Sequence, residues 1–140
     1  MLRWSGVLVT IGLMSGCTSV TVNRVDTGGR PLKIVCIENN PKVLVEDFVP
    51  VVEAGFRRHG IASALHAPPV PSACEFVLTY TATRGWDFVP YLKYAELRLR
   101  DRERTIGFAS YRHRGGFGFS KWAGTASKMT PVIDQLLADY

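Results

Sequence analysis

The sequence predicts an α+β fold, a two-layer sandwich in which two helices pack on one face of a mixed four- to five-stranded sheet. Three observations lead to this prediction. A strand–helix–strand pattern occupies residues 32–65, alternating strand patterns follow in residues 75–113, and an amphipathic helical stripe ends the chain. The first pattern needs a right-handed crossover between parallel strands, whereas the later strands form an antiparallel meander. The expected element order is therefore β-α-β-β-β-β-α.

The first strand and the first helix have the clearest local signals. Residues 32–38 (LKIVCIE) form a short apolar run that is typical of a strand buried on both faces. Residues 46–59 follow helical spacing, with Pro50 in the first turn, where a missing N–H costs little, and Gly60 just past the end. Acidic residues at the start of this segment and basic residues at its end suit the helix dipole.

The later strands follow from the alternation of apolar and polar residues. Residues 61–65 predict a short strand, and a proline-rich turn separates it from the next. Residues 75–84 and 91–100 each place apolar side chains on one face and polar side chains on the other, and residues 105–113 complete the meander. Because the two helices are expected on one face, the other face is partly open. We expect this open face to serve as a docking surface.

The C-terminal segment carries an apolar stripe at helical spacing, interrupted by Pro131. Two interpretations fit the proline. Either the helix kinks there, or Thr130 caps a final helix with Pro131 at its first position. In both cases the stripe indicates core packing rather than a cofactor site.

The N-terminal segment has the pattern of an export signal. Arg3 and an apolar stretch over residues 6–14 precede two small residues and then Cys17. The stretch is too short to span a bilayer, which needs about 20 apolar residues. The run LMSGC resembles the lipobox of bacterial lipoproteins. This resemblance implies a diacylglyceryl group on Cys17, cleavage before it, and acylation of the new amine with a fatty acid such as palmitate.

These signals divide the chain into three parts. We expect residues 1–16 to be a lipoprotein signal peptide, residues 17–31 to be the lipidated cysteine and a flexible tether, and residues 32–140 to be a single globular α+β domain. The tether prediction rests on polar composition, two glycines and a proline, although its valines also fit an edge strand. Thr18 in place of aspartate resembles the enterobacterial sorting pattern, which implies the outer membrane. We expect the membrane-anchored domain to face the periplasm, and the alternative is exposure at the cell surface.

The two remaining cysteines, Cys36 and Cys74, form an even pair in an oxidising compartment. We expect them to form a disulfide bond. The alternative is two buried thiols in neighbouring strands, because cysteine is often fully buried.

The formal charge of +5 limits the possible partners. An exported chain meets little nucleic acid, so we expect no nucleic-acid partner. Phospholipid headgroups, lipopolysaccharide phosphates and acidic protein surfaces remain as anionic partners. The alternative is that the positive net charge only keeps a small domain soluble and marks no partner.

Signals for catalysis are weak. Cys36 could be a nucleophile with His59, His66 or His113 as base, but it lies in an apolar strand where a thiolate is poorly solvated. No GxSxG, HExxH or CxxC motif occurs, and the histidines lack ligand-like spacing. We therefore expect no catalytic residues, no metal, no cofactor and no enzymatic activity.

Aromatic residues gather in two connections of the predicted meander. Two interpretations fit them: a recognition surface flanked by basic residues, since interfaces are enriched in aromatics and arginine, or loops that fold over the sheet and bury the rings as core. The candidate surface for a partner or ligand comprises Arg84, Trp86, Phe88, Tyr91, Phe117, Phe119, Lys121 and Trp122.

Four stretches together resemble a family of small, uncharacterised proteobacterial lipoproteins of the outer membrane. They are KIVCIENNPKV from Lys33, CEFVLTYTA from Cys74, and residues 86–97 and 121–137. The order of elements also resembles the amino-terminal domain of the Tol-system propeller protein and the lipopolysaccharide-assembly lipoprotein, and function does not follow from such an analogy. The resemblance implies a compartment and a fold. We expect a non-enzymatic interaction or assembly module with an envelope protein partner, or a protein that binds an anionic envelope glycolipid or glycan. The oligomeric state remains open.

Overall fold

A computed structural model describes residues 18–102, 104–115 and 119–140. The expected signal peptide, Cys17 and Phe117 lie outside the described residues. Six strands form one mixed sheet in the order β1-β6-β5-β4-β2-β3. Their bounds are Thr18–Asn23, Ile34–Glu38, Ala62–His66, Phe76–Asp87, Val89–Asp101 and Arg104–His113 for β1 to β6. The sheet thus has one strand more than the four to five predicted.

The crossover predicted from the sequence is present. Strands β2 and β3 pair in parallel and are joined by helix α1, Phe48–Arg58. Gly60 follows this helix with φ of +70°, a backbone conformation that favours glycine. Strands β4, β5 and β6 form the expected antiparallel meander.

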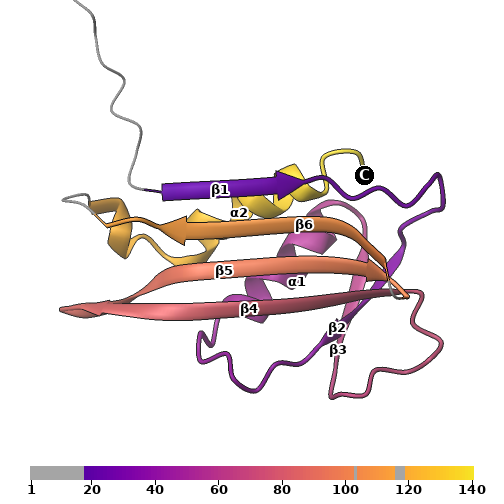
Figure 1. Cartoon of the computed structure of the whole chain (residues 1–140), viewed down its shortest axis with the longest axis horizontal. Helices are drawn as coiled ribbons and strands as arrows, with labels where there is room; N and C mark the ends of the chain where they lie inside the picture. The colour runs from indigo at the N-terminus through magenta and orange to yellow at the C-terminus, as the bar shows by residue number, and fades with distance from the viewer. Residues whose placement is uncertain (1–17, 103, 116–118) are drawn as a thin grey trace, which may run out of the picture.

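Both helices cover the same face of the sheet, as Figure 1 shows. The helix α2, Thr125–Leu136, is one helix with Pro131 inside it, so Thr130 does not cap a separate helix. The core lies between the two layers and contains Phe48, Phe56, Leu97, Met129 and Ile133 among its buried side chains. The α+β two-layer prediction is therefore confirmed. Within residues 18–102, 104–115 and 119–140, no helix combines the length and the apolar character needed to cross a membrane.

The predicted flexible tether over residues 17–31 is wrong for the residues that the structure describes. Thr18–Asn23 is strand β1, which pairs with β6 along its whole length. Val25 is buried, and its N–H donates to the carbonyl of Leu136 at 3.0 Å. The segment is polar because β1 is an edge strand with one face in solvent, and edge strands need few large apolar side chains.

Cys36 in β2 and Cys74 just before β4 form the predicted disulfide, with Cα atoms 6.0 Å apart. The bond lies where the parallel and antiparallel parts of the sheet meet. Strands β2 and β4 have only two register pairs, Cys36↔Val77 and Ile37↔Leu78. The disulfide therefore reinforces the shortest seam in the sheet.

Candidate functional site

The candidate site lies at the end of the sheet formed by the long β4–β5 hairpin. A shift in the strand register between Thr83 and Arg84 marks a β-bulge, and beyond it the hairpin extends to its tip at Phe88. Bulges increase local twist and redirect the side chains that follow. Trp86 and Phe88 near the tip are exposed. Trp86 was expected in the connection between the strands predicted over residues 75–84 and 91–100, but it belongs to β4, because the two strands continue through Gly85 and Pro90.

The second aromatic cluster contacts this hairpin. The short 3-10 helix η1, Phe119–Trp122, places Lys121 in an ion pair with Asp87. The indole N–H of Trp122 donates to the Asp87 carbonyl at 3.0 Å. The Lys121 ammonium also lies 5.6 Å from the ring centre of Tyr91. These contacts join two segments 34 residues apart in the sequence into one surface.

Lys128 of α2 contacts both the β4–β5 hairpin and η1 from the buried side of the sheet. Its buried ammonium donates to the carbonyls of Leu92 and Lys121, one on the hairpin and one on η1. It also lies within 5.8 Å of the ring centres of Tyr91 and Tyr111. Burial lowers the pKa of Lys128, and two carbonyl acceptors with two ring faces compensate part of the lost hydration.

His113 is buried beside these cations. Its ring meets that of Tyr91 edge-on at 5.5 Å, and neither ring nitrogen has a hydrogen-bond partner among the described residues. Burial lowers the pKa of His113, and the charges of Lys128 and Lys121 lower it further. The neutral imidazole is therefore the form that fits this end of the sheet.

Acidification is expected to destabilise the fold through His113. Its pKa in the folded state lies below the unfolded value of about 6.5, so the unfolded chain binds more protons between the two values. The stability that neutral His113 provides is present above the unfolded pKa and is lost as pH falls below it. Urea unfolding of the wild type and of His113→Leu at about pH 7.5 and pH 5.5 measures this. The fall in unfolding free energy should be smaller in the variant, and equal falls would contradict the assignment.

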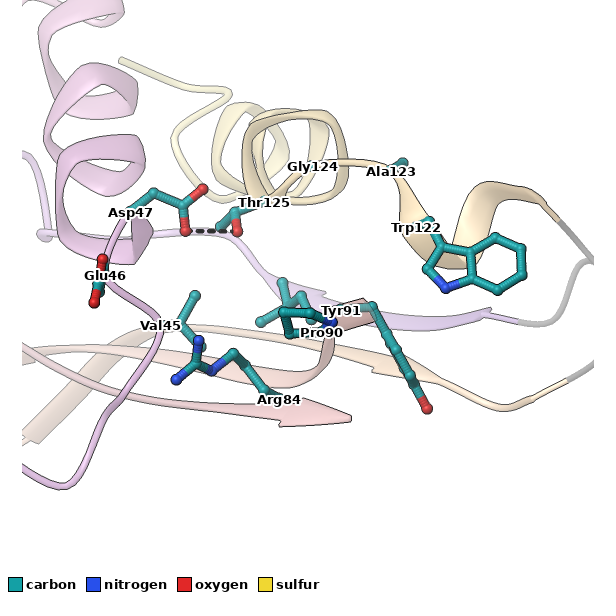
Figure 2. Close-up of a pocket in the computed structure, with 11 residues that line it drawn as sticks. Val45, Glu46, Asp47, Arg84, Pro90, Tyr91, Trp122, Ala123, Gly124 and Thr125 are labelled. Carbon is teal, nitrogen blue, oxygen red and sulfur yellow. Dashed lines mark hydrogen bonds between the residues drawn. The ribbon is translucent and has the colours of Figure 1, made fainter. Parts of the chain in front are cut away.

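A pocket of about 350 Å³ lies beside the hairpin. Figure 2 shows that Glu46 and Asp47 border it from the start of α1, while Thr125 and Trp122 border it from the start of α2 and from η1. The hydroxyl of Thr125 donates to the Asp47 carboxylate at 2.8 Å and so joins the two helix starts. Arg84 enters from the hairpin, with its guanidinium directed toward Val45 and Glu46. The pocket thus combines rings, a guanidinium and carboxylates, as sites for polar ligands do.

The sheet face opposite the helices carries an ordered polar network. Arg98 lies over the ring of Phe108 at 5.2 Å, and Arg112 lies over that of Tyr94 at 4.6 Å. Glu96 accepts from the Tyr94 hydroxyl at 2.7 Å and from Arg98 at 3.0 Å. Burial alone would raise the pKa of Glu96, but these two hydrogen bonds outweigh it and lower the pKa. The network holds two arginines in fixed positions on the uncovered face.

The sequence-predicted site residues divide into three groups. Arg84, Tyr91, Lys121 and Trp122 come together around the pocket and the Lys121–Asp87 ion pair. Trp86 and Phe88 lie farther out at the tip, and Phe119 is the first residue of η1. The burial interpretation is wrong for Trp86 and Phe88, whereas Tyr91 is half-buried, as that interpretation expected.

Sequence reasoning missed Lys128, the part that His113 plays at this site, and the two acidic residues at the start of α1. Lys128 lies between the apolar positions of the C-terminal stripe, where a lysine looks like a solvated residue. His113 extends the alternation of Ala109 and Tyr111 on the buried face, and this was an available signal.

His66 lies near the Cys36–Cys74 bond, and the nitrogen and two sulfur atoms are within 4.8 Å of one another. In this structure the sulfur atoms are bonded to each other. The Cys36 thiol considered as a nucleophile is therefore not present.

Comparisons with known proteins show where this fold recurs. No family model and no curated protein sequence matches the chain. Among solved structures, a PelC dodecamer from Paraburkholderia phytofirmans has a TM-score of 0.55 at 16% identity and covers 84% of this chain and 95% of that one. A variant of that PelC has a TM-score of 0.49 at 15% identity, with 81% and 97% covered. A minor lipoprotein from Acinetobacter baumannii has a TM-score of 0.36 at 14% identity, with 77% and 88% covered. The PelC dodecamer shows that the fold recurs in a solved structure.

Proposed function

We propose that this protein is a lipid-anchored lipoprotein of the bacterial outer membrane, facing the periplasm, and that it acts as a non-enzymatic interaction or assembly module. The N-terminal pattern that ends at Cys17 supports the anchor. The uncovered sheet face supports the interaction role. Its partner is an envelope protein with an acidic surface, because the β5–β6 part of the face presents Arg98, Arg100 and Arg112 around Glu96.

The observation that carries this proposal is the ordered network on the uncovered face. Arginine and aromatic side chains are enriched at protein interfaces and at the residues that dominate binding energy. Here Tyr94 and Phe108 each support an arginine before any partner binds. Side chains that are already ordered lose less entropy on binding, so such a face suits recognition. PelC assembles as a dodecamer, and a second copy of this chain is therefore included among the protein partners to be tested.

A second candidate function is binding of an anionic envelope glycolipid or glycan. The pocket beside the hairpin favours it. Trp122 and Tyr91 border the cavity, Arg84 offers a cation for a phosphate or carboxylate, and the volume of about 350 Å³ falls within the range of small-ligand pockets.

Crosslinked affinity capture of the lipidated protein from its own membranes tests both candidates, with proteins and co-purifying lipids identified by mass spectrometry. We expect one envelope protein in near-equal amount, reduced about tenfold or more by Arg112→Glu, since reversal of an interface charge weakens electrostatic complementarity. Arg57→Glu is the matched control, because Arg57 is exposed on the helix layer and the charge change is the same.

Two other outcomes of the capture experiment would contradict docking of a protein on the uncovered face. Enriched lipopolysaccharide or glycan that is lost with Arg84→Gln and kept with Arg112→Glu would replace the first candidate by the second. Equal capture of a protein by Arg112→Glu and Arg57→Glu would contradict docking on the uncovered face.

A further inference from the structure

The tip of the β4–β5 hairpin exposes apolar side chains that the fold does not require. Trp86 is 76% exposed, Phe88 is 91% exposed and Val89 is 49% exposed. Phe88 has φ of +62°, in the left-handed region that glycine adopts freely and bulky residues rarely adopt. The turn would favour glycine, so a contact outside the chain explains this phenylalanine better than the turn does. Contiguous exposed apolar side chains of this kind mark protein or membrane contacts.

The chain enters the fold at the same end of the sheet as this tip (Figure 1). Thr18 of β1 pairs with His113 of β6, and the residue before His113, Arg112, pairs with Tyr94 of β5. The tip at Phe88 lies about five residues beyond this level, or about 16 Å along the strands. Three strand spacings, about 14 Å, separate β1 from β4. Thr18, the residue that follows Cys17 in the sequence, therefore lies roughly 20 Å from the tip.

The opposite end of the sheet has different chemistry. The turn between β5 and β6 contains Asp101, Arg102 and Arg104, and Asp101 forms an ion pair with Arg30. Strand β5 has 13 residues, so this charged end lies about 40 Å from the aromatic tip. The exposed aromatic rings of the tip thus lie at one end of the sheet, and the Asp101–Arg30 ion pair lies at the other.

Exposed basic residues surround the aromatic end: Arg84, Lys93, Arg112 and Arg114. Asp87 at the tip is paired with Lys121. Anionic phospholipid headgroups attract basic residues near a bilayer surface, at about 1 kcal/mol each. Tryptophan is enriched at the same depth, where one side of its ring is apolar and its N–H is polar.

We propose that the Trp86–Phe88 tip inserts into the headgroup region of the phospholipid bilayer that holds Cys17. The proposal rests on the lipid anchor of the proposed function and adds a second membrane contact. Thr18 and the tip are separated by similar distances along the strands and across them. If the strands tilt by about 45° from the membrane normal, the anchored end of β1 and the tip therefore reach the same depth. Two contacts at the same end of the sheet restrict rotation of the domain about its anchor and keep that end of the sheet at the membrane surface. The Lys121–Asp87 ion pair holds the tip in place for insertion.

The experiment uses the lipidated protein in vesicles of phosphatidylethanolamine and phosphatidylglycerol, with or without phospholipid brominated near the headgroup end of its acyl chains. Trp4 lies before Cys17, so the processed chain has two tryptophans, and Trp122→Phe leaves Trp86 as the reporter. We expect bromine to reduce Trp86 fluorescence about twofold or more, because interfacial side chains lie within about 5–10 Å of the acyl boundary. Phe88→Gly, which relieves the unfavourable φ and stays folded, should reduce this quenching.

The matched control carries Trp86→Phe, Trp122→Phe and Arg104→Trp, which moves the reporter to the charged end of the sheet. We expect no quenching there. Equal quenching of the two reporters would overturn the proposal, and so would an unquenched Trp86 in protein that is lipidated and vesicle-bound. In that case the lipoprotein function would stand and the tip would become a candidate protein contact. Mass analysis of the N-terminal peptide separates the two failures, because absence of acyl chains on Cys17 would overturn the anchor and the insertion together.

Discussion

Replacing Cys36 and Cys74 together by alanine is expected to lower the free energy of unfolding by about 3–4 kcal/mol. The two residues are 38 positions apart, and the bond restricts the unfolded chain over that loop. The location of the disulfide in the sheet is a second reason to expect this loss of stability. Strands β2 and β3 join the antiparallel strands through only two register pairs, so this seam has few backbone contacts of its own.

Urea unfolding of the oxidised protein, the reduced protein and the double variant measures this effect. The reduced protein and the double variant should unfold at similar, lower urea concentrations. A thiol count on denatured, unreduced protein provides the control, since the disulfide leaves neither cysteine reactive. Equal stability of the oxidised protein and the double variant would contradict the expectation.

Ile133→Ala is expected to lower the free energy of unfolding by about 3 kcal/mol, as is typical for a fully buried aliphatic side chain. Ile133 is 1% exposed and packs directly on α1 at Gly55. A Cβ added at Gly55 would lie 2.4 Å from Cγ2 of Ile133, closer than two non-bonded carbon atoms approach in folded proteins. Gly55→Ala alone should therefore destabilise by about 1–3 kcal/mol through overpacking.

A double-mutant cycle tests whether this contact sets the distance between the two helices. Ile133→Ala removes the atom that the new Cβ would meet, so the double variant should lose less stability than the two single losses combined. Additive losses, measured by urea unfolding, would show that the helices adjust their distance instead. The contact also concerns the site, because the starts of these two helices border the pocket through Asp47 and Thr125.

The parts of the fold that the sequence could predict are those where local signals agree with packing. In α1, helical spacing, Pro50 in the first turn and Gly60 after the end all indicate one element, and the structure has it. Strand β1 could not be recognised in the same way. As an edge strand it buries little, and its glycines and proline lie in the following segment, whose order comes from contacts distant in sequence, such as that between Val25 and Leu136.

The types of residue at the site could be predicted from the sequence, but their arrangement in space could be predicted only in part. Aromatic and basic residues in two segments indicated a surface, and the Lys121–Asp87 and Trp122–Asp87 contacts join these segments. The exposure of Trp86 could not be inferred, because the lengths of β4 and β5 depend on the pairing of the whole hairpin. The pocket could not be inferred either, since its walls come from the residues just before α1, from β4, β5 and η1, and from the start of α2, whose distances follow from packing alone.

The position of β1 has a mechanical consequence for a chain anchored at Cys17. A pull that separates the domain from the membrane enters at Thr18 and has a component along the axis of β1. The register pairs from Thr18↔His113 to Asn23↔Phe108 then share the load in shear, instead of breaking one after another from an end. A strand loaded in this way transmits tension to β6 and the rest of the sheet without extending first. Displacement of the anchor would therefore move the whole domain, together with any partner bound to it.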